Sequence, residues 1–238
     1  MDVFAHVTVI QHTSAEYLGL IEDHLEGRKI RFTYVRPFAG AVRLPDVGAI
    51  GDGLIVLGGG PWGAAGPRNL PSLVAEVELT YACLARGIPV MGSGLGAHIL
   101  ALAAGGRVIE APLVLRVETA RRVDEQALNG YLPATYTNVC YVRDRFEPPH
   151  GARVLALGAD EQPALFQIGD NSFGFSGHPG FKPAIAEDLV MEFDESPAEA
   201  AQALAAARVA ARRVEADLIP IMTGLVQLTG WMDRDRPD

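Results

Sequence analysis

The chain contains little cysteine: Cys83 and Cys140 are the only two in 238 residues. Two cysteines outside a CxxC pair cannot form a disulfide framework or a cysteine-rich metal site. Free cysteine is among the most buried residue types, so we expect both to be inert packing residues. This usage is typical of a reducing compartment, and the cytoplasm is the expected location.

Positive charge and long apolar runs are also scarce. The 20 Lys and Arg are outnumbered by 29 Asp and Glu, which gives a formal net charge of -9. Nucleic-acid binding depends on basic residues that neutralise phosphates, so we expect no nucleic-acid partner. No uncharged apolar stretch reaches the roughly 18 residues that a membrane span needs, and the N-terminus lacks the pattern of an export signal. Small molecules or other proteins remain as expected partners.

Apolar residues make up 49% of the sequence, enough for a sizeable core. In the first half, β-branched runs alternate with helical patterns, which is typical of βαβ units and a mainly parallel sheet. The predicted strands cover 6–12, 30–36, 53–60 and 88–92, and the predicted helices cover 15–26 and 70–86. Short runs at 107–117, 136–142, 153–157, 164–168 and 172–176 predict an antiparallel extension of the sheet.

The C-terminal segment, about 181–232, is predicted to be helical. It is rich in alanine, with Ser196 as an expected N-cap and Pro197 at the first helical position, while Pro220 is expected to kink or divide the helix. These helices could complete the core, cover a cleft or form a homo-oligomer face. The whole pattern predicts one α/β domain over 1–238, a flavodoxin-like three-layer sandwich with a mostly parallel central sheet.

The stretch "VMGSGLGAHILALAAGG" (90–106) combines a strand, a glycine-rich turn and a helix. Gly92, Gly94 and Ala97 fit a dinucleotide-binding motif, with Glu110 about 18 residues beyond as its ribose-binding acid. The same turn fits a nucleophile elbow with Gly94 at its apex, where Ser93 is out of register and acts as a turn-former. A third interpretation is that the glycines only let the helix pack closely against the sheet.

Four segments together resemble the class I glutamine amidotransferase domain, the triad glutaminase type. "DGLIVLGGGPWG" (52–63) resembles its Gly-Gly-Pro oxyanion loop, and "GIPVMGSGLGAHILALAAGGRV" (87–108) resembles its nucleophile segment. "PHGARVLAL" (149–157) and "NSFGFSGHPG" (171–180) resemble two later strands of the domain. The resemblance covers about residues 5–180 and implies a flavodoxin-like fold.

In that family a Cys attacks the glutamine amide, a His relays the proton and a Glu orients the His. The resemblance places His178 at the position of the catalytic His. Gly94 stands at the position of the Cys, and Gly180 stands at that of the Glu. Without a thiolate no acyl-enzyme forms, so we expect no glutaminase activity and no cofactor or metal.

The resemblance also implies which groups line the cleft. Gly59 and Gly60, with the N–H of Leu95, match the oxyanion loop, and His98 replaces a usual Gln. The cleft would then bind a small carboxylate or amide, or a partner enzyme subunit.

The alternative is an enzyme with a rewired site. Its missing group would be Ser93, Cys140 or a zinc or iron ion held by His98, His178 and Asp144. Nucleotide binding at the 92–97 turn is a further alternative.

Overall fold

The apolar runs form one nine-stranded sheet in the computed structural model, which describes residues 3–40 and 43–233. Its order is β2-β1-β3-β4-β11-β10-β9-β6-β7. The parallel part consists of β2 (Ile30–Val35), β1 (Ala5–Ile10), β3 (Gly53–Val56), β4 (Val90–Ser93) and β11 (Ser172–Phe175). The antiparallel part consists of β10 (Pro163–Ile168), β9 (Arg153–Leu157), β6 (Val114–Arg122) and β7 (Thr135–Val142).

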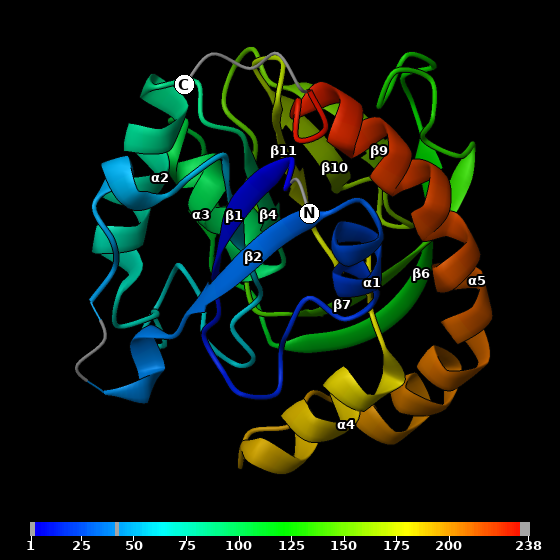
Figure 1. Ribbon diagram of the computed structural model, residues 1–238. Coiled ribbons are helices and arrows are strands. Elements are labelled where there is room, and N and C mark those ends of the chain that lie inside the picture. Colours follow the sequence, from blue (N-terminus) through cyan, green and yellow to red (C-terminus); the bar gives the residue numbers. More distant parts are fainter. Residues whose placement is uncertain (1–2, 41–42, 234–238) are drawn as a thin grey trace.

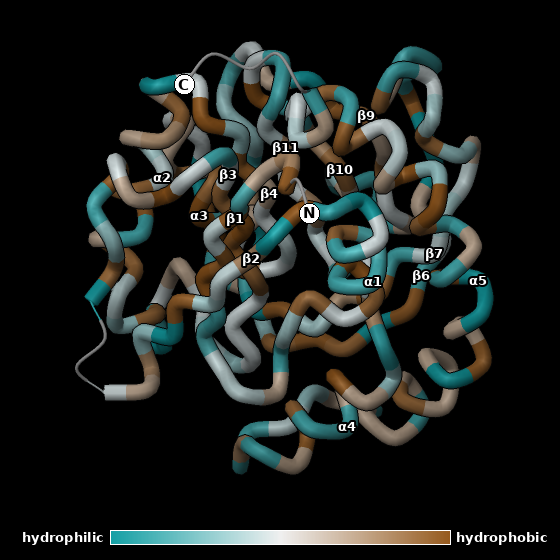
Figure 2. The backbone as a smooth tube through the Cα atoms, in the orientation of Figure 1, coloured by the Kyte–Doolittle hydropathy of each residue, from teal (hydrophilic) through white to brown (hydrophobic). Residues whose placement is uncertain are grey.

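Helices cover both faces of the sheet, as Figure 1 shows. On one face lie α2 (Leu73–Ala85) and α3 (Leu95–Ala103), and on the other lie α1 (Leu20–Gly27) and α5 (Ala200–Leu228). The alternation along β3 explains the three layers, since Leu54 and Val56 join the α2/α3 core while Ile55 joins the α1/α5 core. The predicted flavodoxin-like three-layer fold with an antiparallel extension is therefore confirmed. In Figure 2 the hydrophobic segments gather in the central strands.

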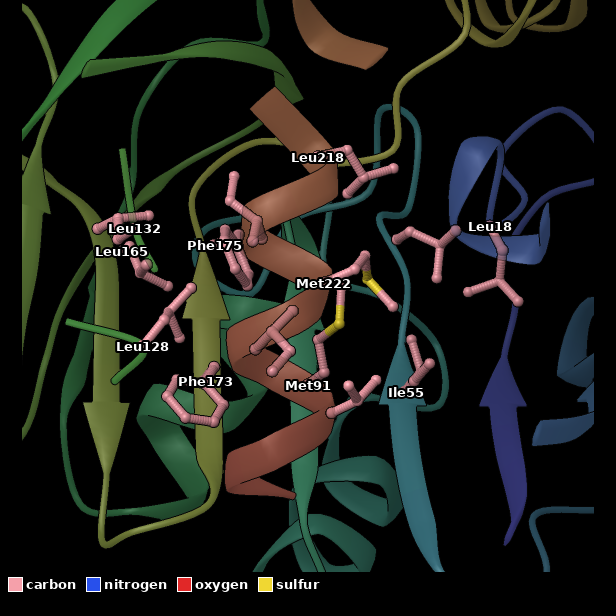
Figure 3. Close-up of a cluster of buried hydrophobic side chains, with 14 of the residues drawn as sticks. Leu18, Ile55, Met91, Leu128, Leu132, Leu165, Phe173, Phe175, Leu218 and Met222 are labelled. Atoms are coloured by element: carbon pink, nitrogen blue, oxygen red, sulfur yellow. The ribbon is translucent and has the colours of Figure 1, made fainter. Parts of the chain in front are cut away.

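The long helix α5 is part of the main core. Leu218 and Met222 pack in one cluster with Ile55 and Met91 (Figure 3). Beyond the helix, the fully buried Trp231 donates its indole N–H to the Asp52 carbonyl at 3.1 Å. The C-terminal helical segment thus completes the core on one face of the sheet.

Several details differ from the sequence predictions. The run 107–117 is split into β5 (Arg107–Ile109) and β6, and β5 pairs with β8 (Arg145–Glu147) in a separate two-stranded sheet. The expected N-cap at Ser196 is wrong, because α5 begins at Ala200 after a left-handed Glu199. Of the two outcomes expected at Pro220, division of the helix is wrong, because α5 runs without a break from Ala200 to Leu228.

Within residues 3–40 and 43–233, no helix is both long enough and apolar enough to cross a bilayer.

Candidate functional site at the glycine elbow

Gly94 forms a sharp turn between β4 and α3. Its φ of 54° and ψ of -118° lie in a region that side-chain-bearing residues rarely adopt. Its N–H donates to the Phe175 carbonyl at 3.0 Å, which fixes the turn to the neighbouring strand β11. This is the backbone of a nucleophile elbow, a strained strand-to-helix turn that presents its apex residue.

The flanking glycines are required by close packing. A Cβ on Gly96 would overlap the Val56 carbonyl oxygen of β3, and a Cβ on Gly92 would overlap the Gly96 carbonyl. At Gly94, by contrast, the nearest atom to an added Cβ is Gly58 Cα at 3.5 Å. The close-packing interpretation therefore explains Gly92 and Gly96, whereas Gly94 has space for a side chain that the sequence does not supply.

The cavity above Gly94 is very small. Its volume is about 10 Å³, at the lower limit of what can hold one water molecule. It is lined by Glu16, Gly94, Tyr141, Gly177, His178, Phe181 and Ile185. Gly94, the candidate histidine His178 and the carboxyl group of Glu16 therefore line the same cavity. Glu16 is not among the site residues predicted from the sequence.

His178 lies buried in the loop after β11. Its Nε2 donates to the Tyr17 carbonyl at 2.7 Å, and its Nδ1 has no hydrogen-bond partner within the described ranges. Burial lowers the pKa of His178 to about 4, although the Tyr17 carbonyl opposes this shift. The ring is therefore neutral at pH 7, with the proton on Nε2 and a lone pair on Nδ1.

Gly180 has no space for the acid of a triad. A Cβ there would lie 2.6 Å from Ile21 Cγ1 and 2.9 Å from Ile21 N. The Gly180 carbonyl accepts the Leu20 N–H at 2.8 Å, so this chain segment packs directly against the loop before α1. The His178 ring consequently meets an uncharged Tyr17 carbonyl, which stabilises an imidazolium less than a carboxylate does.

Glu16 is the site residue that sequence reasoning missed. Its carboxyl is buried, accepts the Gly60 N–H at 3.2 Å and would overlap a Cβ built on Gly58. Burial raises the pKa of Glu16 to about 7, against the opposing effects of the Gly60 N–H and His12. A carboxyl group thus occupies the 58–60 loop, where the resemblance expects an oxyanion to bind.

Glu16 was missed because it falls within the helix predicted over 15–26. The helix begins only at Leu20, because Gly19 has a φ of 63° and a Cβ at this residue would overlap the Gly180 carbonyl. Residues 11–19 therefore form a loop, and the strand predicted over 6–12 ends at Ile10. Gly19 within the apolar pattern was the sole sequence signal of this boundary.

The other residues of the expected oxyanion loop pack against neighbours. A Cβ on Gly59 would overlap the Leu95 side chain, and one on Gly60 would lie 2.9 Å from Phe193 Cε2. The Gly60 N–H is already bonded to Glu16. Leu95 begins α3, so its N–H has no partner within the helix.

His98 lies away from the elbow cavity. It is buried in α3, and its ring contacts Phe146 edge to face with centroids 5.5 Å apart. Burial lowers the pKa of His98 to about 4, partly opposed by the Asp144 charge. It lines a different cavity of about 30 Å³, together with Asp144.

The candidate replacement nucleophiles do not line the elbow cavity. Tyr141 lines it, so the preceding residue of β7, Cys140, points to the opposite face of the sheet. Burial raises the pKa of Cys140 to about 11, which keeps its thiol protonated. Ser93 is fully buried in β4, and Cys83 is buried in α2 with its pKa also raised to about 11 by burial.

The proposed metal ligands are not brought together. His98 and Asp144 line one cavity and His178 lines another. The Asp144 carboxylate accepts three backbone N–H groups, from Ala64 at 2.8 Å, Ala65 at 2.9 Å and Ala111 at 3.1 Å. Over residues 3–40 and 43–233, no group of three His, Cys, Asp or Glu could hold a metal ion.

The dinucleotide arrangement is also not formed. In that motif the acidic residue ends the strand beside the glycine-turn strand. Here β4 is flanked by β3 and β11, whereas β5 and the following Glu110 belong to the separate two-stranded sheet. Glu110 instead lies against Gly66, where an added Cβ would be 2.6 Å from its carboxyl carbon.

Helix α4 (Pro183–Glu192) and the segment after it cover the elbow cleft. Glu192 accepts the Ser14 hydroxyl at 3.1 Å and the Ala15 N–H at 3.2 Å. Glu195 pairs with Arg143, which also donates to the Pro61 carbonyl. Figure 1 shows α4 at the same lower end of the molecule as the loop after β1.

No protein-family model and no curated protein matches this chain. Solved structures match its fold over nearly its whole length. A glutamine amidotransferase from Methylobacillus flagellatus is 22% identical with a TM-score of 0.81, and the match covers 95% of each chain. One from Thermotoga maritima is 19% identical with a TM-score of 0.79, and the match covers 96% of this chain and 99% of the other.

A more distant match is a candidate GMP synthase subunit from Thermoplasma acidophilum, 16% identical with a TM-score of 0.59. It covers 89% of this chain and 100% of the other. At these identities the matches establish the fold alone: the chain has the α/β fold found in glutamine amidotransferases.

Proposed function

We propose that this protein is a class I glutamine amidotransferase-like protein that has lost glutaminase activity and acts by binding. The observation that carries the proposal is Gly94, which has the backbone of a nucleophile elbow and no side chain. Glutamine hydrolysis in this family proceeds through an acyl-enzyme, and without a thiolate that intermediate does not form. Backbone N–H donors alone leave only a small residual rate.

Two further features support the loss of activity. The group that orients His178 is the uncharged Tyr17 carbonyl, and the packing around Gly180 leaves no space for a carboxylate. In addition, Glu16 occupies the 58–60 loop, and the cavity of about 10 Å³ is too small for a glutamine side chain. Restoring the nucleophile by itself would therefore not restore the reaction.

A glutaminase assay tests this proposal. We expect glutamate release from the wild-type protein and from Gly94→Cys to be at most the small residual rate of backbone N–H donors, far below that of an active class I glutamine amidotransferase as the positive control. Turnover comparable to that of the control, lost in His178→Ala, would overturn the proposal.

Labelling with an electrophilic glutamine analogue, followed by mass spectrometry, separates the proposal from a rewired enzyme. We expect no adduct on the wild-type protein. A covalent adduct on any residue of the elbow cleft would identify a replacement nucleophile.

In the ligand form of the proposal, the cleft binds a small carboxylate, which competes with Glu16 for the Gly60 N–H. Glu16→Ala removes the competing group and leaves space above the elbow, so glutamate is expected to raise the melting temperature of this variant more than that of the wild type. At about ten times Kd the stabilisation is about 1.4 kcal/mol, or about 3 °C for a chain of this length. Glu187→Ala, which removes a carboxylate paired with Arg208 on the surface, is the matched control.

The partner form of the proposal places a partner enzyme subunit on the cleft face. A hollow of about 290 Å³ beside the cleft is lined by Ser14, Ala15, Asp188, Met191 and Glu192, and Met191 is 78% exposed. The similar Thermoplasma acidophilum protein is described as a subunit, which supports this form. If Glu16→Ala does not respond to glutamate, the partner form is the favoured binding mode.

A further inference from the structure

A second pocket lies where the first strands of the sheet end. Its volume is about 130 Å³, and it shares no lining residue with the elbow cavity. His12 follows β1, Pro37 follows β2 and Trp62 follows β3, so the pocket lies outside the carboxyl ends of parallel strands. Because β2 and β3 flank β1 on opposite sides, this is the topological switch point, where open α/β sheets bind ligands.

Next to this pocket, the side chains of His12, Glu76 and Ser72 form a hydrogen-bonded network. His12 Nδ1 lies 2.8 Å from the Gly58 carbonyl, and His12 Nε2 lies 2.7 Å from Glu76 Oε2. The Ser72 hydroxyl donates to Glu76 Oε1 at 2.6 Å. The His12 and Glu76 side chains are 1% and 0% exposed, so this hydrogen-bonded pair lies in the interior next to the pocket.

Both ring nitrogens of His12 lie beside oxygen atoms, the Gly58 carbonyl and Glu76 Oε2, so a protonated ring has an acceptor for each of its N–H groups. Burial lowers the pKa of His12, but the Glu76 charge and hydrogen bond outweigh it and the pKa is raised. Ser72 gives its proton to Glu76, so its oxygen lone pairs remain as acceptors.

The walls of the pocket are apolar and partly aromatic. Pro37, Phe38, Trp62, Leu70 and Pro71 complete the lining around His12 and Ser72. An apolar wall with a few polar groups is typical of small-molecule sites. The volume is close to the roughly 150 Å³ of a cavity that holds one benzene molecule, so a single ring fits.

We propose that this switch-point pocket binds a single-ring aromatic molecule with a hydroxyl or N–H donor, which hydrogen-bonds to Ser72 Oγ. The pocket uses no residue of the elbow cavity, so the proposal does not depend on the loss of glutaminase activity.

A pair of fluorinated probes tests the site by ¹⁹F NMR titration of the full chain. 4-Fluorophenol has the ring and the donor, and 4-fluoroanisole has the same ring without the donor. One net hydrogen bond is worth about 1 kcal/mol, so we expect 4-fluorophenol to bind about fivefold more tightly. Equal affinities, or no binding of 4-fluorophenol up to its solubility limit, would overturn the proposal.

Variants locate the binding. Ser72→Ala is expected to abolish the preference for 4-fluorophenol, and Ser72→Thr is expected to retain it because the hydroxyl is kept. Leu70→Trp fills the pocket and is expected to remove binding of both probes. Ser196→Ala, an exposed serine before α5 and outside this pocket, is the matched control. Circular dichroism confirms that each variant is folded, and an unchanged preference in folded Ser72→Ala would contradict the proposal.

Discussion

Replacing Glu16 with glutamine is expected to remove about 3 kcal/mol of pH dependence from the stability of this protein. Burial raises the pKa of Glu16 to about 7 from an ordinary value of 4.5. Between these two values the folded protein holds a proton on Glu16 and the unfolded chain does not. The contribution of Glu16 is thus fully present below about pH 4.5 and is lost as the pH rises through about 7.

The measurement is the free energy of unfolding in denaturant at a series of pH values from about 5 to 8. The wild-type value minus the Glu16→Gln value is expected to fall by about 1.4 kcal/mol per pH unit up to about pH 7 and then to level off. Burial lowers the pKa of His98 and His178, which opposes this trend below about pH 6.5, but both histidines are present in both proteins. Their contributions cancel in the difference.

Glu192→Gln is the matched control for this experiment. Its carboxylate contacts the same loop, through Ser14 and Ala15, but the residue is exposed. The wild-type minus Glu192→Gln difference is expected to stay flat over the same range, because solvent screens an exposed carboxylate. A flat difference for Glu16→Gln would show that Glu16 is not held in a buried environment.

The fold and the elbow were predictable because both depend on local sequence signals. Apolar β-branched runs such as Leu54–Val56 define central strands, and a glycine-rich turn between a strand and a helix has few possible backbones. The antiparallel extension in the second half of the sheet was predictable from short runs separated by turn residues, although its strand order was not. These signals lie within a few residues of the structure that they predict.

The surroundings of the elbow were not predictable in the same way. Glu16 and the Tyr17 carbonyl reach the cavity from a loop that is far from Gly94 and His178 in the sequence. Helical periodicity over 15–26 favoured a regular helix, and the tertiary contact between Gly19 and Gly180 overrode it. The His12–Glu76 pair was missed for the same reason, since a buried ion pair across 64 residues leaves no periodic signal.

Gly96→Ala is expected to destabilise the protein by about 3 kcal/mol or more. The measured change distinguishes two opposing effects, the cost of steric overlap and the gain in helix propensity. Its Cβ would overlap the Val56 carbonyl of a central strand, so α3 must move away from the sheet. Helix propensity favours alanine over glycine by about 1 kcal/mol, so the sign of the measured change identifies the dominant effect. The test is the free energy of unfolding from denaturant titration.

Two further alanine variants complete the series. Gly27 is the last residue of α1 and an added Cβ has no atom within 4 Å, so Gly27→Ala is expected to be neutral or stabilising by up to about 1 kcal/mol. Gly94→Ala has space but a positive φ, so it isolates backbone strain at about 1–3 kcal/mol. If Gly96→Ala were as stable as Gly27→Ala, α3 would not pack against β3 as closely as the elbow requires. The three variants thus measure one effect each: helix propensity at Gly27, backbone strain at Gly94 and steric overlap at Gly96.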